Sequence, residues 1–168
     1  DWLASPYYFS MTPSERSRFQ KTLEYMVEND IRSVVFVYSN NAWSLAGVSM
    51  LKDELQKNGQ INLVGEFKFN QDETDYRTDI LKIKSLDPDA IYSLIATDES
   101  HGIFAQQLKD LGLVYPMFID NSRAESPVLR ERFLSVVVDS IYPAPQETLR
   151  NQEFVTKYET RFGHKPAS

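Results

Sequence analysis

Apolar residues follow two different periods along the chain, and each period predicts a different kind of element. Residues 34–38 form an unbroken β-branched and aromatic run, which is typical of a strand buried on both faces. Similar short apolar runs predict further strands at residues 61–69, 90–95, 116–119 and 136–138. Between these runs the apolar residues recur three or four positions apart, so helices should separate the strands.

The first two predicted helices carry clear start and stop signals. The stretch Thr12-Pro13-Ser14-Glu15 predicts a helix start with Thr12 as the N-cap, and this helix should end near Asn29. Residues 39–44 form a polar turn into a second helix. The pair Asn58-Gly59 should end that helix, because glycine readily adopts the left-handed conformation.

The later helices have signals of the same kind. Thr74 or Asp75 should cap the third helix, and Pro88 should stop it. Further helices are expected after residues 96–100 up to Gly112, from Ser126-Pro127 through Phe133, and at residues 148–162 with Gly163 as the cap. The apolar stripes expected to be buried include Leu45, Val48, Leu51 and Leu55; Ile80, Leu81 and Ile83; and Phe154, Val155, Tyr158 and Phe162.

The alternation of the two periods predicts an α/β fold of three layers. A mainly parallel, doubly wound, Rossmann-like sheet should lie between two layers of helices. Residues 66–95 read as strand, helix and strand with short joints, which is a βαβ unit. Its strands should be parallel and its crossover right-handed.

Length, charge and composition exclude several classes of function. The chain has 168 residues, the size of one domain, and a net charge of −6. A nucleic-acid partner is not expected, because phosphate binding needs a basic surface, and the same holds for an anionic membrane surface. The absence of cysteine excludes disulfides, thiolate chemistry and cysteine-based zinc sites. No apolar run approaches the ~20 residues that a membrane helix needs.

Enzyme signatures are missing from the sequence. It contains no GxSxG elbow, no GxxxxGK[ST] loop and no GxGxxG fingerprint. His101 and His164 stand apart from other ligand-type residues, so we expect both on the surface, with no metal and no other cofactor. Without cysteine a nucleophile–base pair is hard to assemble, and only paired carboxylates stay open as a catalytic arrangement. We therefore predict that the protein is not an enzyme.

Polar segments that follow the predicted strands mark where a ligand would sit, since ligands of open parallel sheets lie beyond the carboxyl ends of the strands. Backbone N–H groups at the helix starts behind the first two segments favour a carboxylate or another anion. Trp43 could cover an apolar or cationic group, or be a plain surface aromatic. Asp98 and Asp120 could hold an ammonium group, or act only as N-caps. The segments are residues 39–44, 96–100, 120–122 and 140–142.

Several stretches resemble a known family. Asp75-Tyr76-Arg77, Leu81-Lys82-Ile83-Lys84 and Pro88-Asp89-Ala90-Ile91-Tyr92 look like the middle of the type I periplasmic binding proteins. The nearest branch binds leucine, isoleucine, valine and related amino acids for uptake. Ser126-Pro127, Tyr142-Pro143 and the aromatic residues of 154–166 resemble this family in order and spacing.

The resemblance implies a two-lobed protein that closes on its ligand. Residues 1–168 would form a single ligand-binding lobe, nearly all of the second one. Residues 1–11 would be the crossover from the first lobe, and residues 164–168 the start of the return crossover.

The resemblance also implies which residues contact the ligand. Trp43 would be the aromatic contact, Thr97 or Asp98 a second contact, and Asp120 or Asn121 the group that receives the ligand's amino group. Asn41, in the same turn as Trp43, completes the candidate set. The sequence departs from the family pattern at Ser44, Ala96 and Ile119, where glycine is common, and at Ser10, where arginine is common.

The function implied is extracytoplasmic solute binding for ABC-type uptake, most simply of an amino acid or related small polar solute. The partners implied are that solute, the missing first lobe and a membrane permease, with a lipid anchor on the full-length protein left open. Two alternatives stand beside it. The same lobe pair serves as the ligand-sensing part of receptors and regulators, and a lobe with these departures could be an interaction module that binds no small molecule.

Overall fold

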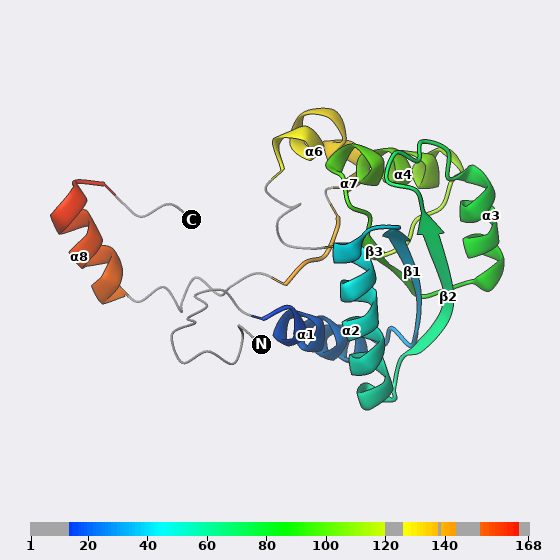
Figure 1. Ribbon diagram of the computed structural model, residues 1–168, viewed down its shortest axis with the longest axis horizontal. Helices are drawn as coiled ribbons and strands as arrows, with labels where there is room; N and C mark the ends of the chain where they lie inside the picture. Colours follow the sequence, from blue (N-terminus) through cyan, green and yellow to red (C-terminus); the bar gives the residue numbers. More distant parts are fainter. Residues whose placement is uncertain (1–13, 120–125, 138, 144–151, 165–168) are drawn as a thin grey trace.

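The computed structural model describes residues 14–119, 126–137, 139–143 and 152–164. In this part of the chain four parallel strands form one sheet, in the order β2-β1-β3-β4 (Figure 1). The predicted parallel α/β fold is therefore confirmed. The strands are β1 (Ser33–Ser39), β2 (Asn62–Phe69), β3 (Ala90–Leu94) and β4 (Met117–Phe118).

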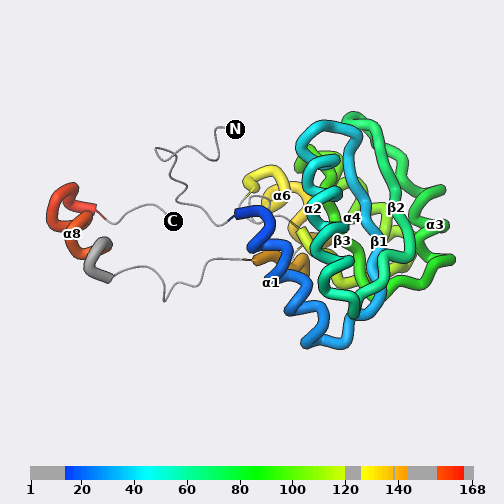
Figure 2. The backbone as a smooth tube through the Cα atoms, turned by 60° about the horizontal axis from the view of Figure 1, so that its bottom comes forward, coloured from blue at the N-terminus to red at the C-terminus, as the bar shows by residue number. Residues whose placement is uncertain are grey.

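Helices cover both faces of this sheet, which gives the three predicted layers (Figures 1 and 2). Helices α1 (Glu15–Glu28) and α2 (Ala42–Asn58) pack on one face, and α3 (Arg77–Leu86) and α4 (Asp98–Asp110) pack on the other. The short helices α6 (Pro127–Arg132) and α7 (Leu134–Val137) lie against α4. Helix α8 (Gln152–Phe162) stands away from the sheet in both views.

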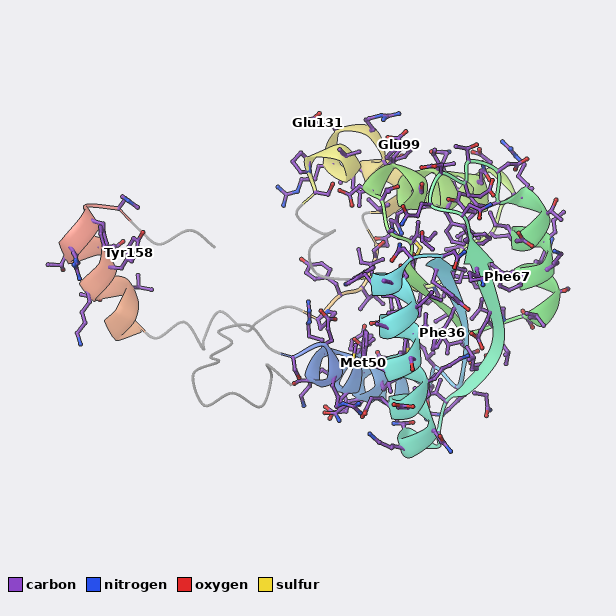
Figure 3. All side chains as sticks on the ribbon, in the orientation of Figure 1. Phe36, Met50, Phe67, Glu99, Glu131 and Tyr158 are labelled. Carbon is purple, nitrogen blue, oxygen red and sulfur yellow. The ribbon has the colours of Figure 1, made fainter. Side chains whose placement is uncertain are left out.

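The unbroken apolar run in β1 is explained by its central place in the sheet. Successive side chains of a strand point to opposite faces. Val34 and Phe36 belong to the core under α1 and α2, whereas Val35 and Val37 belong to the core under α3 and α4. Figure 3 shows the side chains that fill both layers, Phe36 among them. Because both faces of β1 are buried, its central residues 34–37 are all apolar.

The first and third helices are present as predicted, but each begins at a different residue from the predicted one. Thr12, the predicted cap of the first helix, is outside the described residues, and Ser14 caps α1 by accepting a hydrogen bond from the Ser17 N–H at 3.1 Å. The third helix has Tyr76 as its N-cap instead of Thr74 or Asp75. No side chain caps this helix, and the Tyr76 N–H donates to the Gln107 side chain of α4, which holds the residue at this position.

The strand predicted at residues 136–138 is wrong. Residues 134–137 form the helical turn α7, because the N–H groups of Val136 and Val137 both donate to the Phe133 carbonyl. The place beside β4 is taken by Ile141, which bridges Phe118 in parallel. Val138 itself lies outside the described residues.

Four side chains differ from the predicted burial. Leu45 and Leu81 are 42% and 52% exposed, because the buried stripes of α2 and α3 run through Val48, Leu51 and Leu55 and through Ile80 and Ile83. Phe162 is 52% exposed, since α8 stands away from the sheet. His101 is buried, not on the surface, and its Nδ1 shares a 3.0 Å hydrogen bond with the Ser93 hydroxyl. His164 is exposed, as predicted.

A buried carboxylate ties α1 to α2. Glu54 of α2 accepts hydrogen bonds from Lys57 and from Gln20 of α1, each at 2.7 Å, and forms an ion pair with Arg16 of α1. The Lys57 hydrogen bond, followed by that of Gln20, lowers the pKa of Glu54 from 4.5 to about 2. Ionisation of Glu54 therefore stabilises the folded state relative to the unfolded state.

This arrangement gives a pH-dependent prediction. A depressed pKa contributes stability that is complete above the unfolded value, near 4.5, and is lost as the pH falls through about 2. We expect Glu54→Gln to lower the free energy of unfolding at neutral pH, and the difference from wild type to shrink steadily toward pH 2. Urea unfolding followed by circular dichroism at several pH values measures this. A difference that does not change with pH would contradict the prediction, and Glu24→Gln, on an exposed α1 position, is the matched control.

Candidate functional site

The sheet has one point where the connections change direction. The chain leaves β1 through α2 toward β2 on one side, and leaves β3 through α4 toward β4 on the other. The helices α2 and α4 also lie on opposite faces of the sheet. Ligands of doubly wound sheets bind in the crevice at such a switch point, beyond the carboxyl ends of the two strands. The site is therefore expected above the ends of β1 and β3.

Two serines join the ends of these neighbouring strands. The Ser39 hydroxyl oxygen, at the end of β1, accepts a hydrogen bond from the Ala96 N–H just after β3, at 2.9 Å. The Ser44 hydroxyl, in the first turn of α2, donates to the Leu94 carbonyl at 2.7 Å. Both serines are buried. They hold the rim of the crevice, meaning residues 39–44 and 94–100, in one arrangement.

Ser44 stands where the family commonly has glycine, and the structure explains its presence. The side chain is fully buried, and its hydroxyl donates the hydrogen bond that joins α2 to β3. The departure therefore adds a contact within the lobe and places no side chain in the crevice.

Asn41 and Trp43 lie on the β1 side of the rim. Asn41 is the N-cap of α2, and its side-chain oxygen accepts a hydrogen bond from the Ser44 N–H at 2.9 Å. Trp43 follows in the first turn and is 43% exposed. Part of the Trp43 side chain is therefore open to solvent at the rim.

Thr97 and Asp98 lie on the β3 side of the rim. Thr97 is the N-cap of α4 and accepts a hydrogen bond from the Ser100 N–H at 3.1 Å. The Asp98 carboxylate accepts a hydrogen bond from the buried Ser126 hydroxyl at 2.6 Å, and Ser126 is in turn the N-cap of α6. Asp98 therefore links α4 to α6, which is a structural task.

The four candidate residues that the structure describes lie at the same edge of the sheet. Asn41, Trp43, Thr97 and Asp98 all follow the carboxyl ends of strands that are hydrogen-bonded neighbours. Asp120 and Asn121 lie outside the described residues, and β4, which precedes them, pairs in parallel with β3.

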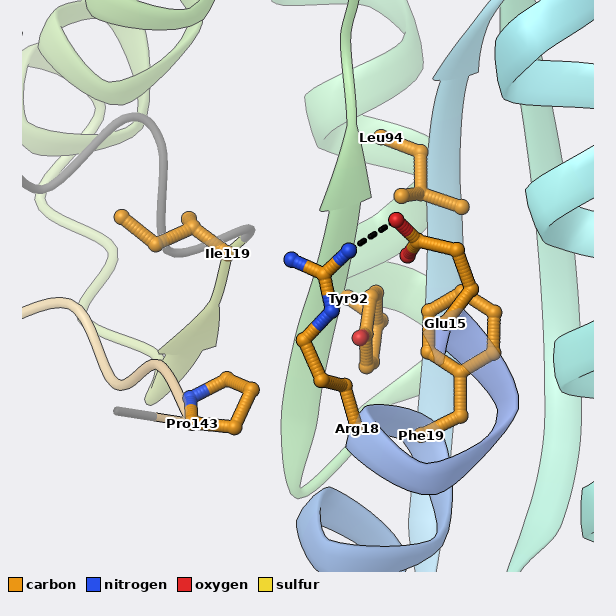
Figure 4. Close-up of a pocket in the computed structure, with 7 residues that line it drawn as sticks. All are labelled: Glu15, Arg18, Phe19, Tyr92, Leu94, Ile119 and Pro143. Atoms are coloured by element: carbon orange, nitrogen blue, oxygen red, sulfur yellow. Dashed lines mark hydrogen bonds and ion pairs between the residues drawn. The ribbon is translucent and has the colours of Figure 1, made fainter. Parts of the chain in front are cut away.

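An open hollow lies beside the rim, on the α1 side of the sheet (Figure 4). It contains about 250 Å³ of space between atoms, open solvent included. Glu15 and Arg18 of α1 form an ion pair at its mouth, above the Phe19 and Tyr92 rings. Sequence reasoning missed this hollow, because its lining residues come from segments far apart in the chain; the spacing of Glu15 and Arg18 by three residues predicts only their ion pair. Its other lining residues are Leu94, Ile119 and Pro143.

Asp89, one of the residues that carry the family resemblance, stabilises the sheet away from the candidate site. Asp89, in the turn before β3, accepts hydrogen bonds from the Arg32 N–H at 2.9 Å and from the Ser33 N–H at 2.7 Å. The Arg32 N–H and the Ser33 donors hold the pKa of Asp89 below its usual value. This carboxylate fixes the start of β1 against β3, at the opposite end of the strands from the crevice.

Tyr76 has a similar structural task on the other face. Its N–H donates to the Gln107 side-chain oxygen at 2.7 Å, while Gln107 donates to the Thr74 carbonyl at 2.8 Å. Burial raises the pKa of the Tyr76 hydroxyl to about 12. Asp75 and Arg77 pair with each other on the surface at 3.0 Å.

The described residues contain no group of three potential metal ligands. No helix in the same residues is both long and apolar enough to cross a bilayer. The rim offers hydroxyls, amides, an exposed indole ring and the N–H groups of two helix starts. This set can bind a small polar or aromatic solute by hydrogen bonds and ring contact.

Comparison with known proteins agrees with this arrangement. The model of the periplasmic binding protein family matches residues 1–168. The chain therefore belongs to the periplasmic binding protein family, and its fold is that of a type I lobe, as the resemblance implied. A search of curated protein sequences found no match to the chain.

Solved structures of low sequence identity share the fold. Periplasmic binding protein type 1 from Bordetella pertussis Tohama I is 18% identical with a TM-score of 0.71, over 92% of this chain and 42% of its own. The leucine-, isoleucine-, valine-, threonine- and alanine-binding protein from Brucella ovis is 14% identical with a TM-score of 0.70, over 96% of this chain and 42% of its own.

A third structure carries a different ligand. The ABC transporter solute-binding protein from Rhodopseudomonas palustris BisB5, in complex with 3,4-dihydroxybenzoic acid, is 19% identical with a TM-score of 0.62. The match covers 96% of this chain and 46% of that one. This chain thus spans a little under half the length of the structures it resembles.

Proposed function

We propose that this chain is one lobe of an extracytoplasmic solute-binding protein that delivers a small solute to an ABC-type permease. Residues 1–168 would form the second of two lobes, with crossovers at residues 1–11 and 164–168. The solute would bind between the lobes and be held by their closure. The observation that carries the proposal is the meeting of two helix starts, α2 and α4, at the joined ends of β1 and β3, with Trp43 exposed beside them.

The chemistry of the rim favours a solute that bears a carboxylate. The N–H groups at the start of α2, which has no acidic residue in its first turn, give this side of the rim a partial positive charge. The start of α4 carries Asp98 and Glu99, so the anion is expected on the α2 side. An amino acid or a related small polar solute fits this edge, and so does an aromatic acid of the kind seen in the Rhodopseudomonas palustris protein. Both would place an apolar or ring portion against Trp43.

The amino group of an amino acid needs a carboxylate partner. The family resemblance implies that this partner is Asp120, or Asn121 next to it, and we assign the ammonium contact to Asp120. Asp98 accepts the Ser126 hydroxyl. Thr97 and Asn41 would contribute hydroxyl and amide groups. An aromatic acid would not need the Asp120 charge, and this difference separates the two solute classes.

Titration calorimetry on the full two-lobed protein tests the proposal, with a panel of amino acids and of benzoates. We expect Trp43→Ala to weaken the bound solute by about tenfold to a hundredfold, because a buried aromatic contact is worth on the order of 1.4–2.8 kcal/mol. Leu81→Ala is the control, since Leu81 is also an exposed apolar residue but lies on α3.

Asp120→Asn then identifies the class. It should weaken an amino acid by at least about tenfold and leave a benzoate nearly unchanged. Unchanged affinity in both variants would contradict the site assignment. Absence of any binding in the panel would contradict the proposed function itself.

A further inference from the structure

Strand β2 leaves one long edge of the sheet open. In the described part of the chain β2 pairs only with β1, whereas the opposite edge ends in the two-residue β4 and is continued by Ile141. Figure 1 shows β2 as the outer arrow of the sheet. An open edge is a template for pairing with another strand, and proteins usually blunt such edges.

The direction of the backbone groups in β2 follows from one hydrogen bond. The Phe69 carbonyl accepts the Asn40 N–H at 2.7 Å, so Phe69 directs its backbone groups to the β1 side. Since alternate residues of a strand bond to the same side, Phe67 does likewise. Glu66 and Lys68 then direct their N–H and C=O groups outward.

A bulge limits the part of the edge that can pair. The register between β1 and β2 shifts at Val34 and Val35, which leaves Val64 as an extra residue between Leu63 and Gly65. A bulge bends and twists a strand and ends regular pairing there. The regular part of the open edge is therefore the short run from Glu66 to Phe69.

The side chains of this short run are complementary in charge to those of the same run in a second, antiparallel copy. Phe67 is half-buried, packs on the α3 and α4 side of the sheet, and is labelled on β2 in Figure 3. Glu66 lies on the α2 side, where Lys52 pairs with it at 2.5 Å, and Lys68 is exposed. In an antiparallel pair with a twofold axis at Phe67, each Glu66 would lie opposite Lys68 of the other copy.

We propose that a second copy of this chain pairs with it through β2, antiparallel and centred on Phe67. Glu66 of one copy and Lys68 of the other would exchange both backbone hydrogen bonds, because their groups are the ones that point outward. The two Phe67 rings would meet as a cross-strand pair on one face, and two Glu66–Lys68 pairs would form on the other. The two four-stranded sheets would become one continuous sheet, with an isologous interface.

Sedimentation velocity on the full-length protein over a range of concentrations tests this proposal. Wild type should dimerise, and Lys68→Glu should weaken the dimer by about tenfold or more, because it opposes like charges at two symmetric places. Glu66→Lys should do the same. Arg130→Glu, the same charge change on an exposed residue of α6, should leave the dimer unchanged.

Mixing the two variants gives the decisive result. In a mixed dimer of Lys68→Glu with Glu66→Lys, both cross-strand pairs are again of opposite charge, so dimerisation should return. Recovery of the dimer on mixing would show that the single variants are folded and that charge repulsion caused their loss of dimerisation. A wild type that stays monomeric would overturn the proposal, as would a dimer indifferent to Lys68→Glu or a mixture that fails to pair. None of these results depends on solute binding, so the proposed function is tested separately.

Discussion

Replacing Tyr76 by alanine should lower the free energy of unfolding by about 3–5 kcal/mol, the usual cost of truncating a large buried aromatic residue. The Tyr76 side chain is fully buried between β2 and α4. Its ring packs edge-on against Phe69, with centroids 4.7 Å apart, and against Phe104 at 5.4 Å. Its hydroxyl donates to the Glu73 carbonyl at 2.8 Å. No neighbouring side chain can fill the space of a whole ring.

Urea unfolding measures this effect, and Tyr76→Phe is its control. The phenylalanine variant keeps the ring and loses one hydrogen bond, so we expect a loss of only about 1 kcal/mol. Equal losses in the two variants would show that the hydroxyl, rather than ring packing, stabilises this part of the core.

Gly102→Ala should destabilise the protein by about 1–3 kcal/mol, although alanine is the better helix former. A Cβ atom at Gly102 of α4 would lie 2.3–2.7 Å from ring atoms of Phe133. Phe133 is buried between α6 and α7, so its ring has little freedom to move away. The expected result is displacement of these two helices from α4, together with the Asp98–Ser126 link.

Gly47→Ala is the matched control for this prediction. Gly47 also lies inside a helix, α2, but a Cβ there would meet the flexible end of Leu94 at 3.3 Å. We expect this variant to be neutral or more stable by up to about 1 kcal/mol. Thermal unfolding of the two variants side by side gives the comparison, and equal effects would show that the Phe133 contact has no consequence.

Much of the fold could be predicted because it depends on local pattern. The apolar run of β1, the stripe of α2 and the glycine stop at Gly59 are all properties of neighbouring residues, and the structure has each of them. The valines at 136 and 137 were misread because their β-branched chemistry favours a strand. Which segment pairs with β4 depends on Ile141 and on the Phe133 carbonyl, and neither choice is visible in the local pattern.

His101 was misread for a reason that can be corrected. The prediction placed it on the surface because no second histidine and no cysteine lies near it in the sequence. Its spacing to Phe104, Ala105 and Leu108 is three, four and seven residues, which is one helix face, and that face is buried. The helical spacing of these residues would have predicted that His101 is buried, whereas the search for metal-ligand clusters gave no information on its burial.

The position of the candidate site could be predicted from the sequence, but the hydrogen bonds that hold its residues in place could not. The rule for strand ends selected the turns with Trp43 and Thr97, and the structure has them after adjacent strands. The partners of Ser39 and Ser44 lie about fifty residues away in the sequence, so the tasks of these serines could not be inferred. Asp98 likewise meets Ser126 only through the packing of α6 on α4.

The serine links between β1 and β3 bear on binding kinetics. Because Ser39 and Ser44 fix the strand ends without any solute, the rim proposed to bind the solute has little conformational entropy left to lose on binding. Solutes of different fit should then enter at similar rates and differ in how long they stay. Residence time, rather than speed of capture, would be the quantity by which this lobe distinguishes one solute from another.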